Sequence, residues 1–324
     1  MQVFNYSAVY PLAPVLRLSG KSVFDLLLDA ARNIFIRRNT MTTEEMLLQE
    51  IVQRGYDARL NEVIKNGVVR KAMAVKGKGN CSPNIYLEKF LKDAENGADI
   101  KTLADEILDI AAKHDGIDFD IDNVLCREYI MSHVYIAVQK ESSEKLIKRG
   151  CGLEGLESYL YLKVKLHGTE GSIKLSDIIL KHAGLTEEEV WAQAEENLKK
   201  ETVIEPVYDM VCHLMKESGR DTGFSEEQRR EMMAGGENLM YVITNKENYF
   251  GASAILDREN IRGLAEKCGV KDFIVIPSSK HEMILVPGRE EFDFSAISDM
   301  VREVNETMVS PEDRLTDRAY RLTA

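Results

Sequence analysis

The chain has 324 residues, with 42 Lys and Arg against 54 Asp and Glu, which gives a formal net charge of −12 at pH 7. Hydrophobic residues at 44 % and charged residues at 30 % are ordinary globular usage and exclude a disordered chain, a collagen and a disulfide scaffold. The acidic balance argues against a nucleic-acid binder that relies on bulk attraction, because such binding needs cationic side chains that displace counterions from phosphates. At about 150 residues per domain, the length predicts two domains.

Residues 1–40 differ in charge from the rest of the chain. They carry a balance of +3, which leaves −15 for the residues that follow. Residues 23–36 place apolar side chains at helical spacing and predict an amphipathic helix, which Asp25 and Asp29 interrupt too often for a membrane span. We expect no secretory signal, because a basic start and a clean apolar stretch are missing. Three interpretations remain: a native start at Met41 that leaves residues 1–40 outside the native chain, a docking helix, and a membrane-surface or targeting segment.

Cysteine usage predicts a reducing compartment. The sequence holds an odd number of cysteines and no C-x-x-C pair, so it encodes no zinc ribbon. Unpaired thiols are typical of the cytoplasm, where they serve as small buried hydrophobes. We therefore expect a cytoplasmic protein. The five cysteines are Cys81, Cys126, Cys151, Cys212 and Cys268.

The first elements after the N-terminal segment are predicted to be a helix and a hairpin. Thr42 and Glu45 form a capping box, so a helix is expected to begin there and to end at Gly55. Two β-rich runs over residues 58–77 are joined by an Asn-Gly pair at 66–67, which adopts the positive φ angles of a tight hairpin turn. The remaining elements of this half are a strand at 82–87, a helix at 100–114, strands at 129–139 and 159–168, and a helix with a capping box at Thr186 and Glu189.

A polar stretch at 217–237 that ends in two glycines predicts a linker. It divides the chain into an N-terminal α+β subdomain at 41–216 and a C-terminal α+β subdomain at 238–324. Strands joined by short turns favour an α+β fold of mixed, mainly antiparallel sheets with helices on one face, because parallel pairs need long crossovers. The C-terminal unit is predicted as β-β-α-β-β-α, with strands at 239–244 and 252–256, a helix at 257–267, strands at 273–277 and 282–287, and a helix through 294–304.

Two motifs begin and are not completed. Asp118, Asp120 and Asp122 alternate as in a calcium loop, but its glycine and its closing glutamate are missing. Residues 117–122 therefore predict a half-buried edge strand with an acidic solvent face. The glycines at 76–80 lack the rest of a phosphate-binding loop and predict a flexible turn. No histidine pair has metal-site spacing, so the sequence predicts neither a metal site nor a cofactor.

The polar segment between the last two predicted strands carries the candidate catalytic residues. Ser279 and His281 stand two residues apart in a tight turn and are able to face the same way, with Glu282 beside them. Nucleophilic catalysis needs a hydroxyl within hydrogen-bond reach of an imidazole that a third group orients. No G-x-S-x-G elbow is present, and the alternative is a hairpin turn in which the serines bond to their own backbone. The candidate ligand-binding residues are Ser278 and Asn245, which belongs to a second polar cluster at a strand end.

Three C-terminal runs resemble an uncharacterised domain-of-unknown-function family of gut anaerobic bacteria: MYVITNKENYFGASAIL, DFIVIPSSKHEMILVP and MVREVNETMVSPEDRLTDRAYR. The hairpin VIKNGVVRKAMAV and the run SPNIYLEKF are similar to the N-terminal half of that family. The resemblance spans about residues 41–320 and leaves 1–40 outside. It brings no known activity, cofactor or catalytic residue. It implies a bacterial cytoplasmic protein that forms one unit, in which 217–237 separates subdomains only.

The leading functional hypothesis is a non-enzymatic protein- or ligand-binding module, because no catalytic, metal or nucleotide motif is completed. The acidic surface suits protein partners or cationic ligands, and neither nucleic acid nor a membrane span is expected. A homo-oligomer is left open. The alternative is a hydrolase-like enzyme in which Ser279 and His281 act with support from Glu282 or Asn245. A structural or assembly role comes third.

Overall fold

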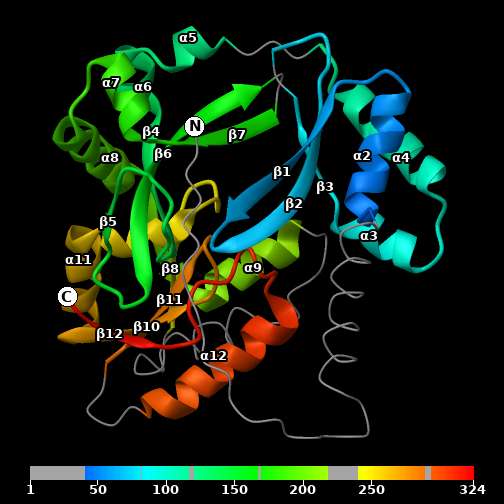
Figure 1. Ribbon diagram of the computed structural model, residues 1–324. Helices are drawn as coiled ribbons and strands as arrows, with labels where there is room; N and C mark the ends of the chain where they lie inside the picture. Colours follow the sequence, from blue (N-terminus) through cyan, green and yellow to red (C-terminus); the bar gives the residue numbers. More distant parts are fainter. Residues whose placement is uncertain (1–40, 81, 117–119, 167–168, 218–239, 289–292) are drawn as a thin grey trace, which may run out of the picture.

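Three antiparallel sheets form the framework of the protein (Figure 1). The computed structural model describes residues 41–324 except 81, 117–119, 167–168, 218–239 and 289–292. Every strand pair in this part of the chain is antiparallel. The α+β class and the mainly antiparallel sheets are therefore confirmed. The expectations for residues 1–40, and for all but the first residue of the linker at 217–237, lie outside the described residues.

The N-terminal lobe, residues 41–116, packs helices on a three-stranded sheet. Its strands are β1 (Ala58–Lys65), β2 (Val68–Val75) and β3 (Asn84–Tyr86), and its helices are α2 (Thr43–Gln53), α3 (Glu88–Glu95) and α4 (Ile100–Lys113). The capping box of Thr42 and Glu45 is present at the start of α2, as expected. Apolar residues of all three helices and of β2 and β3 form a core of their own between helices and sheet, including Ile51, Met73 and Ile107.

The middle sheet carries four strands. They are β4 (Val134–Lys140), β5 (Lys148–Gly150), β6 (Leu156–Leu166) and β7 (Thr169–Lys174), and β6 pairs with each of the other three. The helices of this region are α5 (Ile121–Val124), α6 (Arg127–His133), α7 (Asp177–Ala183) and α8 (Glu187–Glu201). The predicted capping box of Thr186 and Glu189 starts α8, whose buried residues Val190, Trp191 and Leu198 join the core of this sheet.

The C-terminal sheet has five strands in the order β12-β10-β11-β9-β8. They are β8 (Thr202–Pro206), β9 (Tyr241–Asn245), β10 (Asp272–Pro277), β11 (Met283–Pro287) and β12 (Tyr320–Thr323). The other elements are the helices α9 (Val207–Glu217), α11 (Arg258–Cys268) and α12 (Phe294–Met308) and the 3₁₀ helix η2 (Gly251–Leu256). Because β8 precedes residues 217–237 and β9 follows them, segments on both sides of the expected linker build one sheet.

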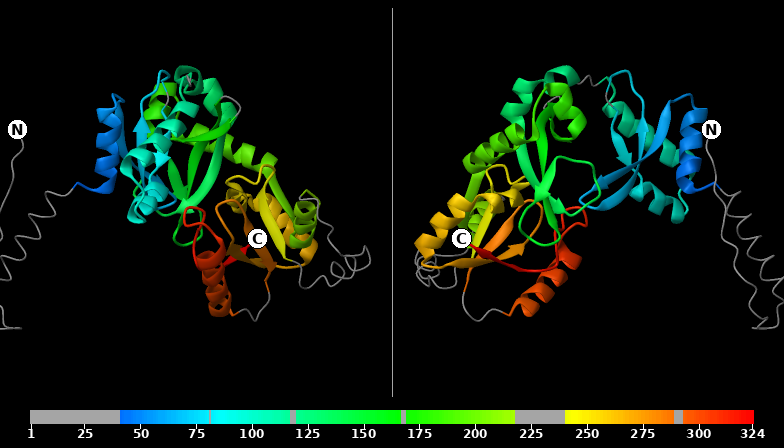
Figure 2. Two further views of the ribbon diagram at one scale, coloured as in Figure 1. Left: turned by 90° about the vertical axis from the view of Figure 1, so that its right-hand side faces the viewer. Right: turned by 60° about the vertical axis from the view of Figure 1, so that its left-hand side comes forward.

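The middle and C-terminal sheets also share a hydrophobic core. Val138 of β4 and Leu156 of β6 pack together with Phe273 of β10 and Leu285 of β11. Cys151 belongs to the same core and is buried. Figure 2 shows the consequence: the middle and C-terminal parts lie against each other, whereas the N-terminal lobe projects to one side.

The predicted strand at 252–256 is wrong, because these residues lie in η2. Both edges of β9 are already occupied, by β8 on one side and β11 on the other, so no strand can be added beside it. Gly251 allows the close approach that the helix needs: a Cβ there would lie 2.2 Å from Thr244 Oγ1 and 2.5 Å from the carbonyl oxygen of His281. The short apolar run therefore turns back and packs over the sheet, where Ala252 and Ile255 are buried.

Two further predictions in the middle of the chain are corrected. Of the edge strand predicted at 117–122, residues 117–119 lie outside the described residues, and the rest is not a strand: Asp120 is the N-cap of α5, and its side chain accepts a hydrogen bond from the Asn123 amide (3.1 Å). The strand predicted at 129–139 begins only at Val134, because the preceding residues form α6, in which the rings of Tyr129 and His133 stack 3.9 Å apart. In both places a local helix signal outweighed the alternation of apolar residues.

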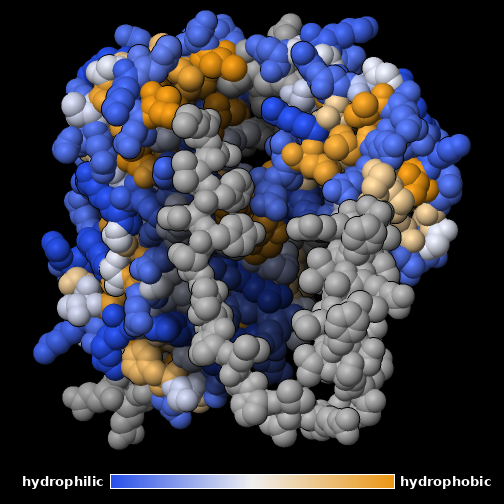
Figure 3. All heavy atoms as spheres, viewed as in Figure 1, coloured by the Kyte–Doolittle hydropathy of each residue, from blue (hydrophilic) through white to orange (hydrophobic). Residues whose placement is uncertain are grey.

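The described surface is mainly hydrophilic on the face shown in Figure 3. Large apolar side chains are nevertheless exposed on helices, among them Ile178 on α7 and Met308 on α12. Within the described ranges, no helix combines the length and the apolar character that crossing a membrane requires.

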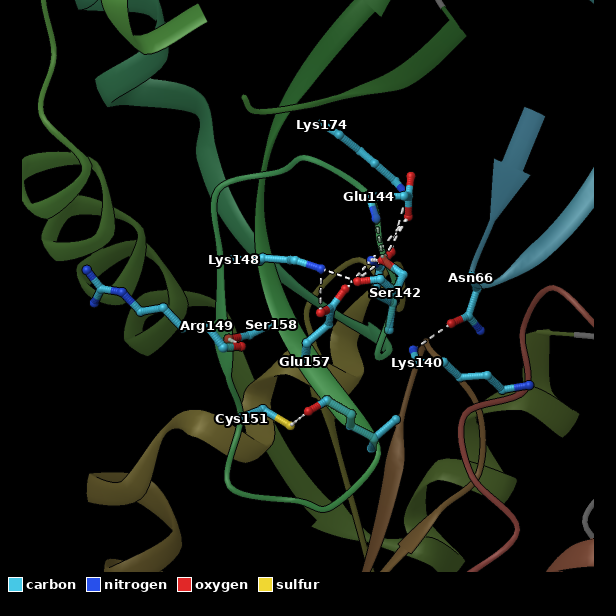
Figure 4. Close-up of polar contacts among 12 residues, drawn as sticks. Asn66, Lys140, Ser142, Glu144, Lys148, Arg149, Cys151, Glu157, Ser158 and Lys174 are labelled. Carbon is cyan, nitrogen blue, oxygen red and sulfur yellow. Dashed lines mark hydrogen bonds and ion pairs between the residues drawn. The ribbon is translucent and has the colours of Figure 1, made fainter. Parts of the chain in front are cut away.

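Asn66, at the tip of the β1–β2 hairpin, joins the N-terminal lobe to the rest of the protein. Its φ of 49° and that of Gly67 (76°) are the positive angles of the predicted turn. The side-chain amide donates to the carbonyl oxygens of Glu312 (3.2 Å) and Arg314 (2.6 Å), and its oxygen accepts from the Lys140 amide (2.9 Å). Figure 4 shows Asn66 reaching the backbone of Lys140. Only 6 % of the residue is exposed, so these bonds form in a largely dry contact.

We expect Asn66→Gly to weaken the attachment of the N-terminal lobe without disturbing the turn, because glycine also adopts a positive φ. Three backbone groups would lose their partner, so the free energy of unfolding should fall by about 1–3 kcal/mol in urea denaturation. The free energy of unfolding should fall further in Asn66→Asp, because a carboxylate would face two carbonyl oxygens. Faster proteolysis between the lobe and the middle sheet should accompany both changes. Unchanged stability in Asn66→Gly would contradict the role assigned to the side chain.

Candidate functional site

The predicted polar turn connects β10 to β11 and is held by its own side chains. The hydroxyls of Ser278 and Ser279 both donate to Glu282 Oε1, each over 2.9 Å. The Ser279 hydroxyl also accepts from the His281 amide (3.0 Å), and the Ser279 amide donates to the carbonyl oxygen of Glu282 (3.1 Å). Ser279 is 8 % exposed. The serines thus close the turn through bonds to the carboxylate and the backbone.

The His281 imidazole faces other segments of the chain. Its Nδ1 accepts from the Phe250 amide (3.3 Å), which leaves the ring proton on Nε2, 3.6 Å from Asp313 Oδ1. The same carboxylate contacts Lys280 Nζ (2.6 Å) and accepts from the Ser310 hydroxyl (2.6 Å). Burial alone would raise the pKa of Asp313, but Lys280, Ser310 and His281 together hold it below its ordinary value.

The structure therefore brings Ser279, His281 and Glu282 into one turn without joining the hydroxyl to the imidazole. Nucleophilic attack by Ser279 needs that contact, and here the hydroxyl proton is directed to Glu282. Asn245 is 7 % exposed and bonds to Tyr249 through both atoms of its side-chain amide (2.8 and 3.1 Å). Its side chain thus closes the loop after β9. Among the described residues, no three His, Cys, Asp or Glu side chains are grouped so that they could hold a metal ion.

A cavity of about 540 Å³ opens elsewhere, between α8, β5 and the start of α11. This volume lies within the range of small-molecule sites. Its wall combines apolar side chains, one indole and charged groups of both signs. The lining residues are Ile136, Arg149, Gly150, Ser158, Trp191, Glu195, Leu198, Lys199, Leu256, Asp257, Arg258, Glu259 and Arg262. We refer to it as the α8–α11 pocket.

A buried polar network anchors the β5 side of the pocket (Figure 4). Lys148 Nζ contacts Glu157 Oε2 (2.9 Å), and Gln139 donates to Glu157 Oε1 (2.8 Å). Burial alone would raise the pKa of Glu157, but its bonds to Gln139, Lys148 and Ser142 hold it below its ordinary value. The neighbouring Arg149 points away from this network. Its side chain is thus presented to the pocket by a strand that the network fixes.

The α11 side of the pocket is built by a helix start. Asp257 caps α11: one carboxylate oxygen accepts from the Asn260 amide (3.1 Å) and the other from the Asn260 side chain (2.7 Å). Arg258 and Arg262 follow at a spacing of four residues and line the pocket. Arg258 is exposed overall, yet the groups that crowd its guanidinium lower its pKa.

The α8 side supplies an aromatic wall. Trp191 is 3 % exposed, and the Arg149 guanidinium lies 4.6 Å from the centre of its ring. Within the described residues the indole Nε1 has no hydrogen-bond partner. A buried donor without an acceptor is rare in folded proteins. Trp191 is therefore the point in this wall where the fold leaves a polar group unsatisfied.

Sequence reasoning did not find this pocket. Its residues come from six elements, β4, β5, β6, α8, η2 and α11, which are spread over the chain, and none completes a motif. Two signals were available: the chain contains a single tryptophan, and Arg258 and Arg262 stand at helical spacing behind a capping residue. Neither signal places these elements around one cavity. The partners of His281 were missed for the same reason, since Asp313 lies 32 residues away from it in the sequence.

Comparison with known proteins identifies the family. The model of a "Family of unknown function (DUF5688)" matches residues 40–323. The chain belongs to this family, which confirms the resemblance to an uncharacterised family, while an origin in gut anaerobes stays a prediction. No curated protein and no solved structure matches the chain significantly.

Ser279→Ala should destabilise the protein more than Ser278→Ala. The first change removes the bond to Glu282 and the acceptor for the His281 amide, whereas the second leaves both in place. We expect the free energy of unfolding, measured by urea denaturation, to fall by about 1–2 kcal/mol in Ser279→Ala and by about half of that in Ser278→Ala. Equal losses would mean that the serine hydroxyls do not fix the turn in this way.

Proposed function

We propose that this protein is a non-enzymatic ligand-binding module of the bacterial cytoplasm, and that its ligand occupies the α8–α11 pocket. One observation carries the proposal: a concave site of about 540 Å³ combines an indole, apolar side chains and guanidiniums. Small-molecule sites typically join an apolar wall to a few polar groups that fix orientation. A small ligand is favoured over a protein partner because the site is hollow.

Binding is favoured over catalysis by the chemistry of the wall. The pocket lining of the described residues contains no histidine or cysteine. The Ser158 hydroxyl donates to the carbonyl oxygen of Arg149 (3.1 Å), and both oxygens of Asp257 are occupied by Asn260. Guanidiniums are always protonated and cannot serve as general bases. Apart from the Glu195 carboxylate, what remains is a set of groups that hold a ligand in place.

Glu195→Phe should abolish ligand binding by filling the pocket. Glu195 is an exposed lining residue on α8, so a large apolar side chain there enters the cavity without disturbing the core. The matched control is Glu196→Phe, one position along the same helix and outside the lining. Equilibrium dialysis against a mixture of bacterial metabolites, followed by mass spectrometry, should recover a compound with the wild type and with the control only. Equal recovery by all three proteins would contradict the assignment of the pocket.

The hydrolase alternative rests on Ser279 and His281 and has its own test. Because the Ser279 hydroxyl donates to Glu282, we expect a fluorophosphonate probe to leave the wild type unlabelled at this residue. Mass spectrometry of the modified peptides compares the wild type with Ser279→Ala. Labelling that is present in the wild type and lost in the variant would favour the hydrolase-like enzyme over a binding module.

A further inference from the structure

We infer that the α8–α11 pocket binds a small organic anion, whose carboxylate or phosphate contacts Arg258 and Arg262 and whose apolar body packs beside Trp191. The inference rests on the proposed function and narrows its ligand to one chemical class. It runs against the overall charge of the chain, which is −12 and would favour cationic ligands.

Arg258 and Arg262 supply positive charge that the described residues do not neutralise. Neither guanidinium contacts a carboxylate in that part of the chain, although both line the pocket. Four residues apart on α11, they share one side of the helix. Arg59 and Arg314 also lack a carboxylate partner among the described residues, but neither lines the pocket. Six other arginines are paired with a carboxylate: Arg54, Arg70, Arg127, Arg302, Arg318 and Arg321. Two unpaired guanidiniums in one concave site are thus a place for an external anion.

Most carboxylates of the pocket are already engaged. Both oxygens of Asp257 accept from Asn260. Glu259 lies 3.7 Å from Lys199, which also contacts Glu196 at 3.5 Å. The carboxylate of Glu195 has no cation within ion-pair distance in the described part of the chain. It is thus the one lining carboxylate whose charge opposes an anionic ligand directly.

The remaining cation of the lining, Arg149, contacts both a carboxylate and the indole. It lies 3.6 Å from Glu187 and over the Trp191 ring. The ion pair is exposed, since the Arg149 and Glu187 side chains are each 43 % exposed. Exposed ion pairs are weak and exchange readily. Arg149 is therefore free to turn toward a bound anion as a third charge.

The apolar part of the wall favours a ligand that has an apolar body as well as a negative charge. Ile136, Leu198 and Leu256 line the cavity together with Trp191. Ile136, Leu198 and Trp191 are largely buried, so only the small parts of the wall that face the cavity meet water. An inorganic ion would leave these parts hydrated, whereas an organic body would cover them. The Trp191 Nε1 atom is itself buried, so the ligand is expected to pack beside the indole rather than to bond to this nitrogen.

The test uses Trp191 itself as the reporter, because it is the single tryptophan of the chain. Titrations of the full-length protein with phenyl phosphate and benzoate should each change the tryptophan fluorescence saturably, and added salt should weaken both responses. Benzyl alcohol, which has the ring without the charge, and inorganic phosphate, which has the charge without the ring, should each bind at least about tenfold more weakly. The two anionic arms distinguish a phosphate ligand from a carboxylate ligand.

Charge variants supply the control. Arg258→Gln and Arg262→Gln should each weaken the anionic probes about tenfold, whereas Arg302→Gln on α12 should leave binding unchanged. Glu195→Gln should tighten binding, because it removes the opposing charge. Equal affinity for benzyl alcohol, unchanged affinity in both arginine variants, or no saturable response to either anion would overturn the inference. If the protein retains a neutral metabolite in the dialysis experiment and Glu195→Phe abolishes its binding, the proposed function is supported and the inference of an anionic ligand is wrong.

Discussion

The pairing of β8 with β9 holds the pocket together. Helix α8 contacts β4 of the middle sheet and runs directly into β8, which forms an edge of the C-terminal sheet. The Lys246 amide donates to the carbonyl oxygen of Glu201 (3.1 Å), so the junction of helix and strand is itself bonded to the end of β9. One continuous segment thus fixes the two sheets relative to each other. The cations of β5, α8 and α11 meet around a single cavity because of this constraint.

Local charge, rather than the total, decides what such a cavity attracts. The chain carries −12 overall, yet the cavity contains two guanidiniums without an acidic partner among the described residues. Exposed charges farther apart than about 8 Å are largely screened at physiological salt, so the distant acidic surface has little effect inside the pocket. The turn after β10 differs from the pocket, because its polar side chains are bonded to one another and to Asp313.

Features that depend on residues close together in the sequence were predicted correctly, whereas features that depend on distant segments were not. The hairpin at 58–75 and the starts of α2 and α8 were predicted correctly because Asn66 with Gly67 and two capping boxes act within a few residues. The run at 252–256 was assigned wrongly because only the neighbours of β9 exclude a strand there. The candidate residues around Ser279 were brought into one turn, but the direction of each hydrogen bond depends on partners such as Phe250 and Asp313. The pocket is built by six elements that meet only in the folded chain, so it has no local sequence signature.

The contacts of Asn66 also bear on the order in which the protein forms. Its side chain bonds to backbone groups 246 and 248 residues later in the sequence. The N-terminal lobe has its own core and is the first part of the described chain to leave the ribosome, so it is able to fold early. Its docking, however, must wait until residues 312–314 have been synthesised, because contacts of such sequence separation close last. The hydrogen bonds at the hairpin tip therefore form late in folding, after the segment that contains Glu312 and Arg314 has been synthesised.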